Sequence, residues 1–186
     1  MTFPTRSEAF AILTEHTQGD SLRKHALAVE GAMRYYAARA GEDVEAWGVA
    51  GLLHDFDYER YPSLEDHPFR GAEILRARGI DEELIQTILS HGDHTGVERT
   101  TPMRRTLFAV DELSGFVTAV ALVRPSKKLG DVEPSSVKKK LKDKGFARNV
   151  SREDIRRGAE LLGISEDEHI THVLSALKAI APDLGL

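Results

Sequence analysis

Apolar residues recur along this chain at steps of three and four positions, which is the spacing of one face of an α-helix. In residues 20–41, for example, the positions on one such face are His25, Val29, Met33 and Tyr36. No segment shows the strict alternation of apolar and polar residues that is typical of a half-buried strand. The pattern therefore predicts an all-α protein in which His25 lies on the apolar face of a helix.

Capping residues, prolines and glycines indicate where the helices begin and end. The predicted helices cover residues 6–17, 20–41, 43–54, 66–79, 81–91, 101–123 and 134–142. Two more begin at Ser151 and Ser165, where Asp154 and Glu168 complete the pattern of a capping box. We expect Pro182 to end the last helix, because proline lacks the backbone N–H that a helix interior uses.

The composition, with 41% hydrophobic and 30% charged residues among 186, is that of an ordinary globular protein. We expect one domain over residues 1–186, with a core at about 21–123 and a basic segment with C-terminal helices at 124–186. The absence of cysteine excludes disulfides, a thiolate nucleophile and a Cys-type zinc site. No apolar run reaches the ~20 residues of a membrane span, and the first residues lack the pattern of a signal peptide. We therefore expect a cytoplasmic protein with no membrane partner.

The net charge of −5 is unevenly distributed along the chain. Residues 124–148 contain nine Lys or Arg and three acidic residues, so this segment carries about +6 and the rest of the chain about −11. One basic segment in an acidic protein favours local anion binding over general nucleic-acid binding. We therefore expect no stable nucleic-acid partner.

Histidine and aspartate residues recur in and beside the predicted helices. His54 and Asp55 end an apolar run at a helix C-terminus, where a buried charge needs a partner. His25 and Asp111 lie on or beside the apolar faces of two other helices. Because imidazole and carboxylate are suitable ligands of divalent transition metals, we predict that these four residues bind such an ion. A bound metal lowers the pKa of water from about 15.7 toward about 7, which would let the site activate water.

The order and spacing of these residues resemble the HD superfamily of metal-dependent phosphohydrolases, over roughly residues 21–115. The residues that carry the likeness are His25, His54, Asp55 and Asp111, and the strings Gly51-Leu-Leu-His-Asp, His67-Pro68-x-x-Gly71 and Ile88-x-x-His91 resemble its HDIG subgroup. The resemblance implies an all-α HD-domain bundle of five or more helices around a central metal site, here with extra C-terminal helices. It also implies hydrolysis of phosphomonoester or phosphodiester bonds, often in nucleotides.

Residues 111–151 are also similar to a group of small, uncharacterised predicted HD hydrolases. The chain departs from the HDIG pattern in two places: Asp57 stands where the subgroup has glycine, and His91-Gly92 replaces the His-His pair of members with two metals. A second metal held by His67, His91 and a bridging Asp55 is therefore an open alternative. The ion itself, one or two of Mn, Fe, Co, Ni, Mg or Zn, is not fixed by these ligand types.

Other charged residues have both a functional and a structural interpretation. Asp57 and Glu59 either orient ligands and move protons or are surface acids of a loop. His169 and His172, three residues apart, are expected on a solvated helix face. Residues 138–140, a run of three lysines, are expected to be solvated as well.

Arg124, Lys127 and Lys128 are the predicted phosphate ligands, because they directly follow the helix that carries Asp111. The sequence thus favours a metal-dependent phosphohydrolase acting on a small phosphorylated metabolite, a nucleotide mono- or diester. Its catalytic residues would be Asp55, together with His67 and His91, two histidines that precede Asp111.

Two other functions stay open. A two-iron oxygenase on the same scaffold is motivated by the possible extra ligands His67 and His91. A non-enzymatic nucleotide sensor is motivated by the long basic tail beyond the shared core. The sequence predicts neither the oligomeric state nor the identity of the substrate.

Overall fold

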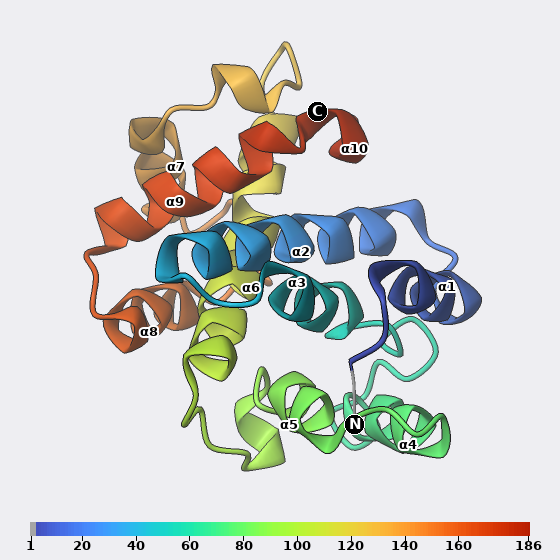
Figure 1. Cartoon of the computed structure of the whole chain (residues 1–186). Helices are drawn as coiled ribbons and strands as arrows, with labels where there is room; N and C mark the ends of the chain where they lie inside the picture. The colour runs from blue at the N-terminus through green and yellow to red at the C-terminus, as the bar shows by residue number, and fades with distance from the viewer. Residues whose placement is uncertain (1–2) are drawn as a thin grey trace.

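A computed structural model describes residues 3–186 of the chain. Within these residues every regular element is helical and no strand is present (Figure 1), so the prediction of an all-α fold is confirmed. The helices are α1 Arg6–His16, α2 Asp20–Ala40, α3 Val44–Leu53, α4 Phe69–Ala77, α5 Glu82–Leu89, α6 Pro102–Leu122, α7 Pro134–Leu141, α8 Arg152–Leu162, α9 Glu166–Ala179 and α10 Ala181–Leu184. Two single 3₁₀ turns, Asp93–Thr95 and Leu129–Asp131, lie in the connections.

Side-chain caps explain most of the helix starts. Asp43, Asp81 and Thr101 accept backbone N–H groups in the first turns of α3, α5 and α6, as Ser151 and Ser165 do for α8 and α9. The prediction of full capping boxes at the two serines is only half right. The serine side chain accepts its bond in each case, but in the described residues the reciprocal bond is present only in α1.

Three predicted helix ends differ from the structure. α5 ends at Leu89, so His91 lies in the turn beyond it rather than on the helix. α4 begins only at Phe69, after the His67–Pro68 peptide. Pro182 does not end α9; it lies in the first turn of α10, where a missing N–H costs no helical hydrogen bond.

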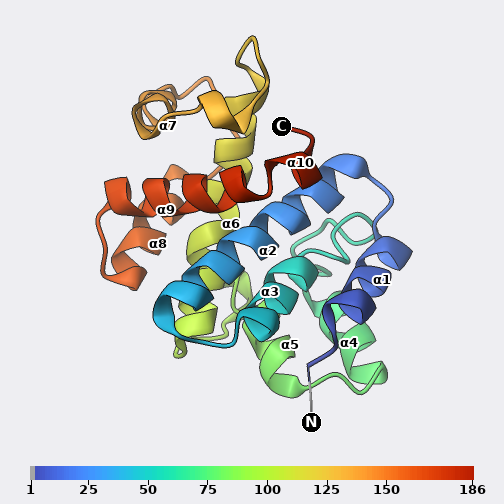
Figure 2. The ribbon, with the colours of Figure 1, turned by 45° about the horizontal axis from the view of Figure 1, so that its top comes forward.

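The long helices α2 and α6 form the centre of the molecule. α2 packs against α3, α6 and α9, while α8 packs along α6 and α1 along α3 (Figures 1 and 2). α3 approaches α2 closely at Gly51, where a Cβ atom would lie 2.9 Å from the backbone oxygen of Val29. This close crossing brings the C-terminal end of α3 next to the N-terminal half of α2.

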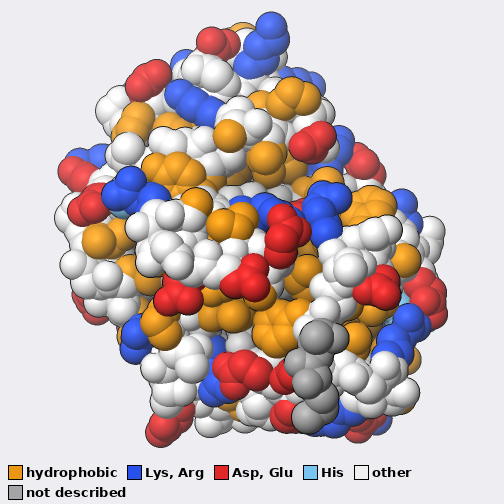
Figure 3. All heavy atoms as spheres, viewed as in Figure 1, with side chains coloured by type: hydrophobic (Ala, Val, Ile, Leu, Met, Phe, Trp, Pro, Cys, Tyr) orange, Lys and Arg blue, Asp and Glu red, His pale blue; other side chains and the backbone are white. Residues whose placement is uncertain are grey.

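One face of α6 points into the core. Its members Leu107, Val110, Ser114, Val117 and Ala121 are all buried. At the surface, acidic and basic side chains are interspersed over the face shown in Figure 3. None of the helices in residues 3–186 is long and apolar enough to cross a membrane.

The expectation of a solvated face for His169 and His172 is wrong, because α9 packs on α2 and α6 and buries both rings. The Tyr36 hydroxyl donates to Nδ1 of His169 over 2.7 Å, and Nε2–H of His169 donates to the carbonyl oxygen of Ala109 over 2.8 Å. Burial lowers the pKa of His169 to about 4. This histidine is therefore a neutral hydrogen-bonding link between α2, α6 and α9.

Candidate metal centre

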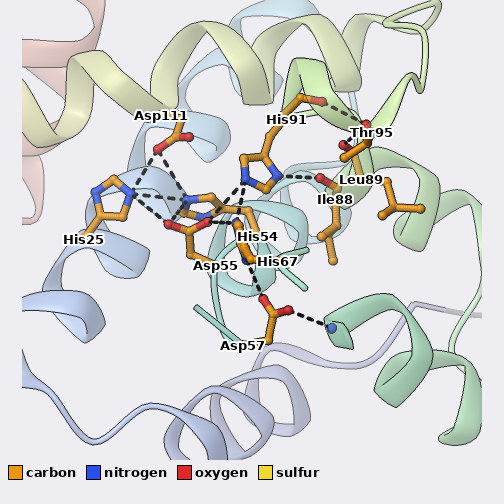
Figure 4. A network of polar contacts seen from close by, with 12 residues as sticks. His25, His54, Asp55, Asp57, His67, Ile88, Leu89, His91, Thr95 and Asp111 are labelled. Carbon is orange, nitrogen blue, oxygen red and sulfur yellow. Dashed lines mark hydrogen bonds and ion pairs between the residues drawn. The ribbon is translucent and has the colours of Figure 1, made fainter. Parts of the chain in front are cut away.

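Three helices bring the four predicted metal ligands to one place (Figure 4). α2 supplies His25, the end of α3 supplies His54 and Asp55, and α6 supplies Asp111. Nε2 of His25 lies 3.0 Å from Oδ1 of Asp111 and 3.2 Å from Nε2 of His54. Nε2 of His54 lies 3.4 Å from Oδ2 of Asp55. The helix crossing at Gly51 positions this group, because it brings the α3 end toward His25.

A second group of ligand atoms lies on the other side of Asp55. Nε2 of His67 lies 3.2 Å, and Nε2 of His91 lies 3.3 Å, from Oδ1 of Asp55. The two Nε2 atoms lie 3.2 Å from each other. The carboxylate of Asp55 therefore lies between two histidine pairs, with Oδ2 toward His25 and His54 and Oδ1 toward His67 and His91.

Hydrogen bonds on the outer nitrogens set the tautomers of three of the histidines. Nδ1–H of His54 donates to the carbonyl oxygen of Gly51 at 2.8 Å, and Nδ1–H of His91 donates to that of Ile88 at 2.6 Å. Nδ1–H of His67 donates to Oδ1 of Asp57 at 2.8 Å. In the neutral rings, Nε2 therefore carries a lone pair that points into the centre, as in histidine metal ligands.

This donor set fits divalent cations. The facing Nε2 atoms of His67 and His91 have no hydrogen to share when both rings are neutral, so a cation between them is what satisfies their lone pairs. The ligand atoms of His25, His54 and Asp55 all lie within 4.8 Å of one another, and so do those of the Asp55–His67–His91 group. Each group would offer nitrogen and oxygen donors to a divalent ion, and Asp55 belongs to both groups.

The pKa values describe a site that attracts positive charge. Burial lowers the pKa of His54, but the carboxylates of Asp55 and Asp111 outweigh burial and raise it well above its usual value. Burial also lowers the pKa of His67, yet Asp55 and Asp57 raise it to about 9. The centre therefore takes up protons when no metal competes for its nitrogens, and a bound cation would take the place of these protons.

The structure decides between the two interpretations of Asp57 and of Glu59. Asp57 is 0% exposed and accepts from both His67 and the backbone N–H of Gly71, the latter at 2.7 Å. It is therefore an orienting residue and not a surface acid. Glu59 accepts the backbone N–H groups of Gln18 and Gly19, so it fixes the connection into α2.

Two further residues, His94 and Glu112, lie beside the centre. Nε2–H of His94 donates to the backbone oxygen of His67 at 2.8 Å, so it supports that ligand's loop without facing Asp55. Burial and the neighbouring Asp111 raise the pKa of Glu112 to about 7. Its carboxylate accepts the backbone N–H of Ser151 at 3.1 Å. The only sequence signal for Glu112 was its position directly after Asp111.

The predicted phosphate ligands Arg124, Lys127 and Lys128 lie at the C-terminal end of α6. This helix is unbroken from Pro102 to Leu122, so the thirteen residues from Asp111 to Arg124 separate them by about 20 Å. The guanidinium of Arg124 is directed to Ser136 Oγ, at 3.4 Å. The role of these three residues in phosphate binding stays a prediction.

The HD domain family model matches residues 22–115. Ribonuclease Y of Thermosipho melanesiensis is 29% identical over 162 residues, which cover 84% of this chain and 30% of that protein. Ribonuclease Y of Thermotoga petrophila is 30% identical over 139 residues, which cover 73% of this chain and 27% of that protein. Ribonuclease Y of Enterococcus faecalis is 29% identical over 170 residues, which cover 89% of this chain and 32% of that protein.

This chain thus spans a little under a third of the length of these relatives. No solved structure matches it significantly. The matched region contains all the predicted ligands of both histidine groups, from His25 on α2 to Asp111 on α6. The chain therefore belongs to the HD-domain family of metal-dependent phosphohydrolases.

Proposed function

We propose that this chain hydrolyses a phosphate mono- or diester of a nucleotide at the Asp55 centre. The observation that carries the proposal is the position of the Asp55 carboxylate between two histidine pairs. Divalent ions bound there supply Lewis acidity and a water whose pKa is lowered toward about 7. His25, His54, Asp55 and Asp111 would hold one ion, and Asp55, His67 and His91 a second.

The exposure of the ligands indicates the side from which substrate approaches. The side chains of His25, Asp55 and Asp111 are 22%, 22% and 20% exposed, whereas that of His54 is 0% exposed. The phosphate therefore approaches along the His25–Asp111 side, and His54 forms the floor. The outer hydrogen bonds of His54, His67 and His91 hold the rings in place, which lowers the reorganisation cost during the reaction.

An exposed aromatic ring beside the centre supports a nucleotide substrate. The ring of Tyr58 is 40% exposed and meets His67 edge-on, with 5.2 Å between ring centroids. A base attached to a metal-bound phosphate would lie near this ring, and base–aromatic stacking contributes about 1–3 kcal/mol. The relatives named ribonuclease Y add short RNA to the candidate substrates.

The shared Asp55 also supports a second candidate, the two-iron oxygenase. Two histidine pairs joined by one carboxylate would suit two iron ions as well as two ions for hydrolysis. The two reactions differ in what they consume. Oxygen uptake by iron-loaded protein would favour the oxygenase, whereas release of phosphate or nucleotide without oxygen favours hydrolysis.

The test is a panel of metal-loaded proteins. Protein loaded with Mn, Fe, Co, Ni, Mg or Zn is assayed on phosphate monoesters, cyclic and linear dinucleotides and a short RNA, with metal content measured for each sample. We expect turnover with at least one metal, and a higher KM for nucleotides in Tyr58→Ala. Tight nucleotide binding without turnover under any metal would replace this proposal with the sensor function.

A further inference from the structure

The connection between α7 and α8 carries basic side chains that the proposed function does not use. We name residues 142–150 the basic loop. Lys144 and Arg148 are exposed, and neither forms a salt bridge or hydrogen bond within residues 3–186. Asp143, an acid of the same loop, lies 3.6 Å from Lys140 in α7. The loop therefore presents positive charge without an internal partner.

Arg152 at the start of α8 holds this loop in a fixed shape. Its guanidinium donates to the carbonyl oxygens of Val150 at 2.8 Å, of Asp143 at 3.4 Å, and of Phe146 and Ala147. Four carbonyl groups from one loop thus converge on one cation. Fixing the backbone of each residue costs about 1–2 kcal/mol of entropy, and these charge-assisted bonds offset part of that cost in the free protein. The cations of the loop are consequently presented on an ordered backbone.

The basic loop ends beside the metal centre. The backbone N–H of Ser151, the residue after the loop, donates to Glu112, which follows the ligand Asp111. The ring of Phe146 packs edge-on against Phe116 of α6, with 5.4 Å between centroids. Arg148 precedes Ser151 by three residues, so its backbone lies within about 11 Å of the Glu112 contact. An arginine side chain can span much of that distance.

On this basis we infer that the basic loop, through Lys144 and Arg148, binds a phosphate group next to the one that is cleaved. The inference rests on the proposed function and narrows its substrate to a short RNA strand or oligonucleotide, which has neighbouring phosphates along one chain. A nucleoside monophosphate would leave the loop without a ligand. The residue that follows the loop, Ser151, bonds to Glu112 next to Asp111, whereas the predicted turn at Arg124 is about 20 Å from Asp111 along α6.

The test measures binding of a fluorescein-labelled hexanucleotide with phosphorothioate linkages to the metal-loaded protein, by fluorescence anisotropy. The variant is Lys144→Ala/Arg148→Ala, and the control is Arg39→Ala/Lys139→Ala. Each removes two exposed positive charges, but Arg39 lies at the far end of α2 from His25 and Lys139 lies on α7. Circular dichroism and metal content check that both variants fold.

We expect the loop variant to raise the Kd of the hexanucleotide about tenfold, while the control keeps the wild-type value. Each phosphate contact to a single strand contributes about 0.7 to the slope of log K against log salt, so loss of the one phosphate contact should make the slope shallower by about 0.7. Equal Kd values for wild type and the loop variant would overturn the inference. An equal rise of the Kd in the control variant would overturn the inference too, because net charge alone would then explain the binding.

A small diester separates this inference from the proposed function. For bis(p-nitrophenyl) phosphate, which has no neighbouring phosphate, the loop variant should keep the wild-type kcat and KM. A fall of kcat/KM for this diester as large as the fall in affinity for the hexanucleotide would contradict the inference, since the loop would then act on the centre itself. If the wild type cleaves no substrate but shows loop-dependent binding of the hexanucleotide, the proposed hydrolysis fails, and only the role of the loop in binding a phosphate of the strand stands.

Discussion

Replacement of Asp57 by asparagine tests whether the second histidine group binds metal. Asp57 lies outside the ligand set, but its two oxygens accept from Nδ1–H of His67 at 2.8 Å and from the Gly71 N–H at 2.7 Å. Asparagine has nearly the same shape but only one acceptor oxygen. If that oxygen keeps the bond to the buried Gly71 N–H, the amide NH₂ faces Nδ1 of His67. The ring must then accept at Nδ1 and carry its proton on Nε2, the atom that faces Asp55.

The size of the effect follows from this change of tautomer. Loss of such an orienting partner typically lowers metal affinity or activity 10- to 100-fold, which corresponds to about 1.4–2.8 kcal/mol. Only the group of Asp55, His67 and His91 should be affected. The group that contains His25 and His54 keeps its own hydrogen bonds, so one metal should stay at wild-type affinity in Asp57→Asn.

Isothermal titration with Mn²⁺, together with metal content by mass spectrometry and turnover on the best substrate, provides the assay. Asp66→Asn is the matched control, because this acid lies on the same loop one residue before His67 but is partly exposed and bonds to Ser63 and Arg70. If Asp57→Asn bound two ions as tightly as wild type and turned over substrate at the same rate, the assignment of His67 as a metal ligand would be refuted.

Four further predictions test the remaining parts of the molecule. Asp55→Ala should abolish both metal binding and activity, because its two oxygens face both histidine pairs; full metal occupancy with unchanged turnover would contradict the shared role. His91→Ala should reduce activity and metal content by one ion while the other ion stays; unchanged kinetics would place His91 outside the site. The pKa of His169 is lowered to about 4 in the folded protein, against about 6.5 unfolded, which corresponds to about 3 kcal/mol of stability. This stability is fully present above pH 6.5 and is lost as the pH falls toward 4. In His169→Gln, the free energy of unfolding in urea should therefore depend less steeply on pH across this range, and an equally steep dependence would remove His169 as the cause. Lys128→Ala should weaken inhibition by inorganic phosphate at constant metal content; an unchanged inhibition constant would assign the turn after α6 to other contacts.

The sequence alone determined the helical class and predicted the four residues of the first candidate ligand group. Helical periodicity, caps and the glycine and proline positions are local signals, so most helices have the predicted bounds within a few residues. Four candidate ligands from three helices were also predictable, because imidazole and carboxylate at buried positions need a cation or another partner. His25 and Asp111 are 86 residues apart in the chain, and the structure places them 3.0 Å apart.

Only the tertiary structure decided what depends on packing between distant elements. The glycine pattern did not reveal that Asp57 is buried, because this follows from the close approach of α4 at Gly71. The burial of His169 depends on α9 lying across α2 and α6, and no residue near it in sequence signals that contact. Likewise, net charge marked the whole segment 124–148 as basic. Because α6 is straight, the start of this segment at Arg124 lies far from Asp111. The bond between Ser151 and Glu112 places the end of the segment closer to Asp111. Charge and periodicity are properties of the chain, whereas distance between side chains is set by how the helices pack.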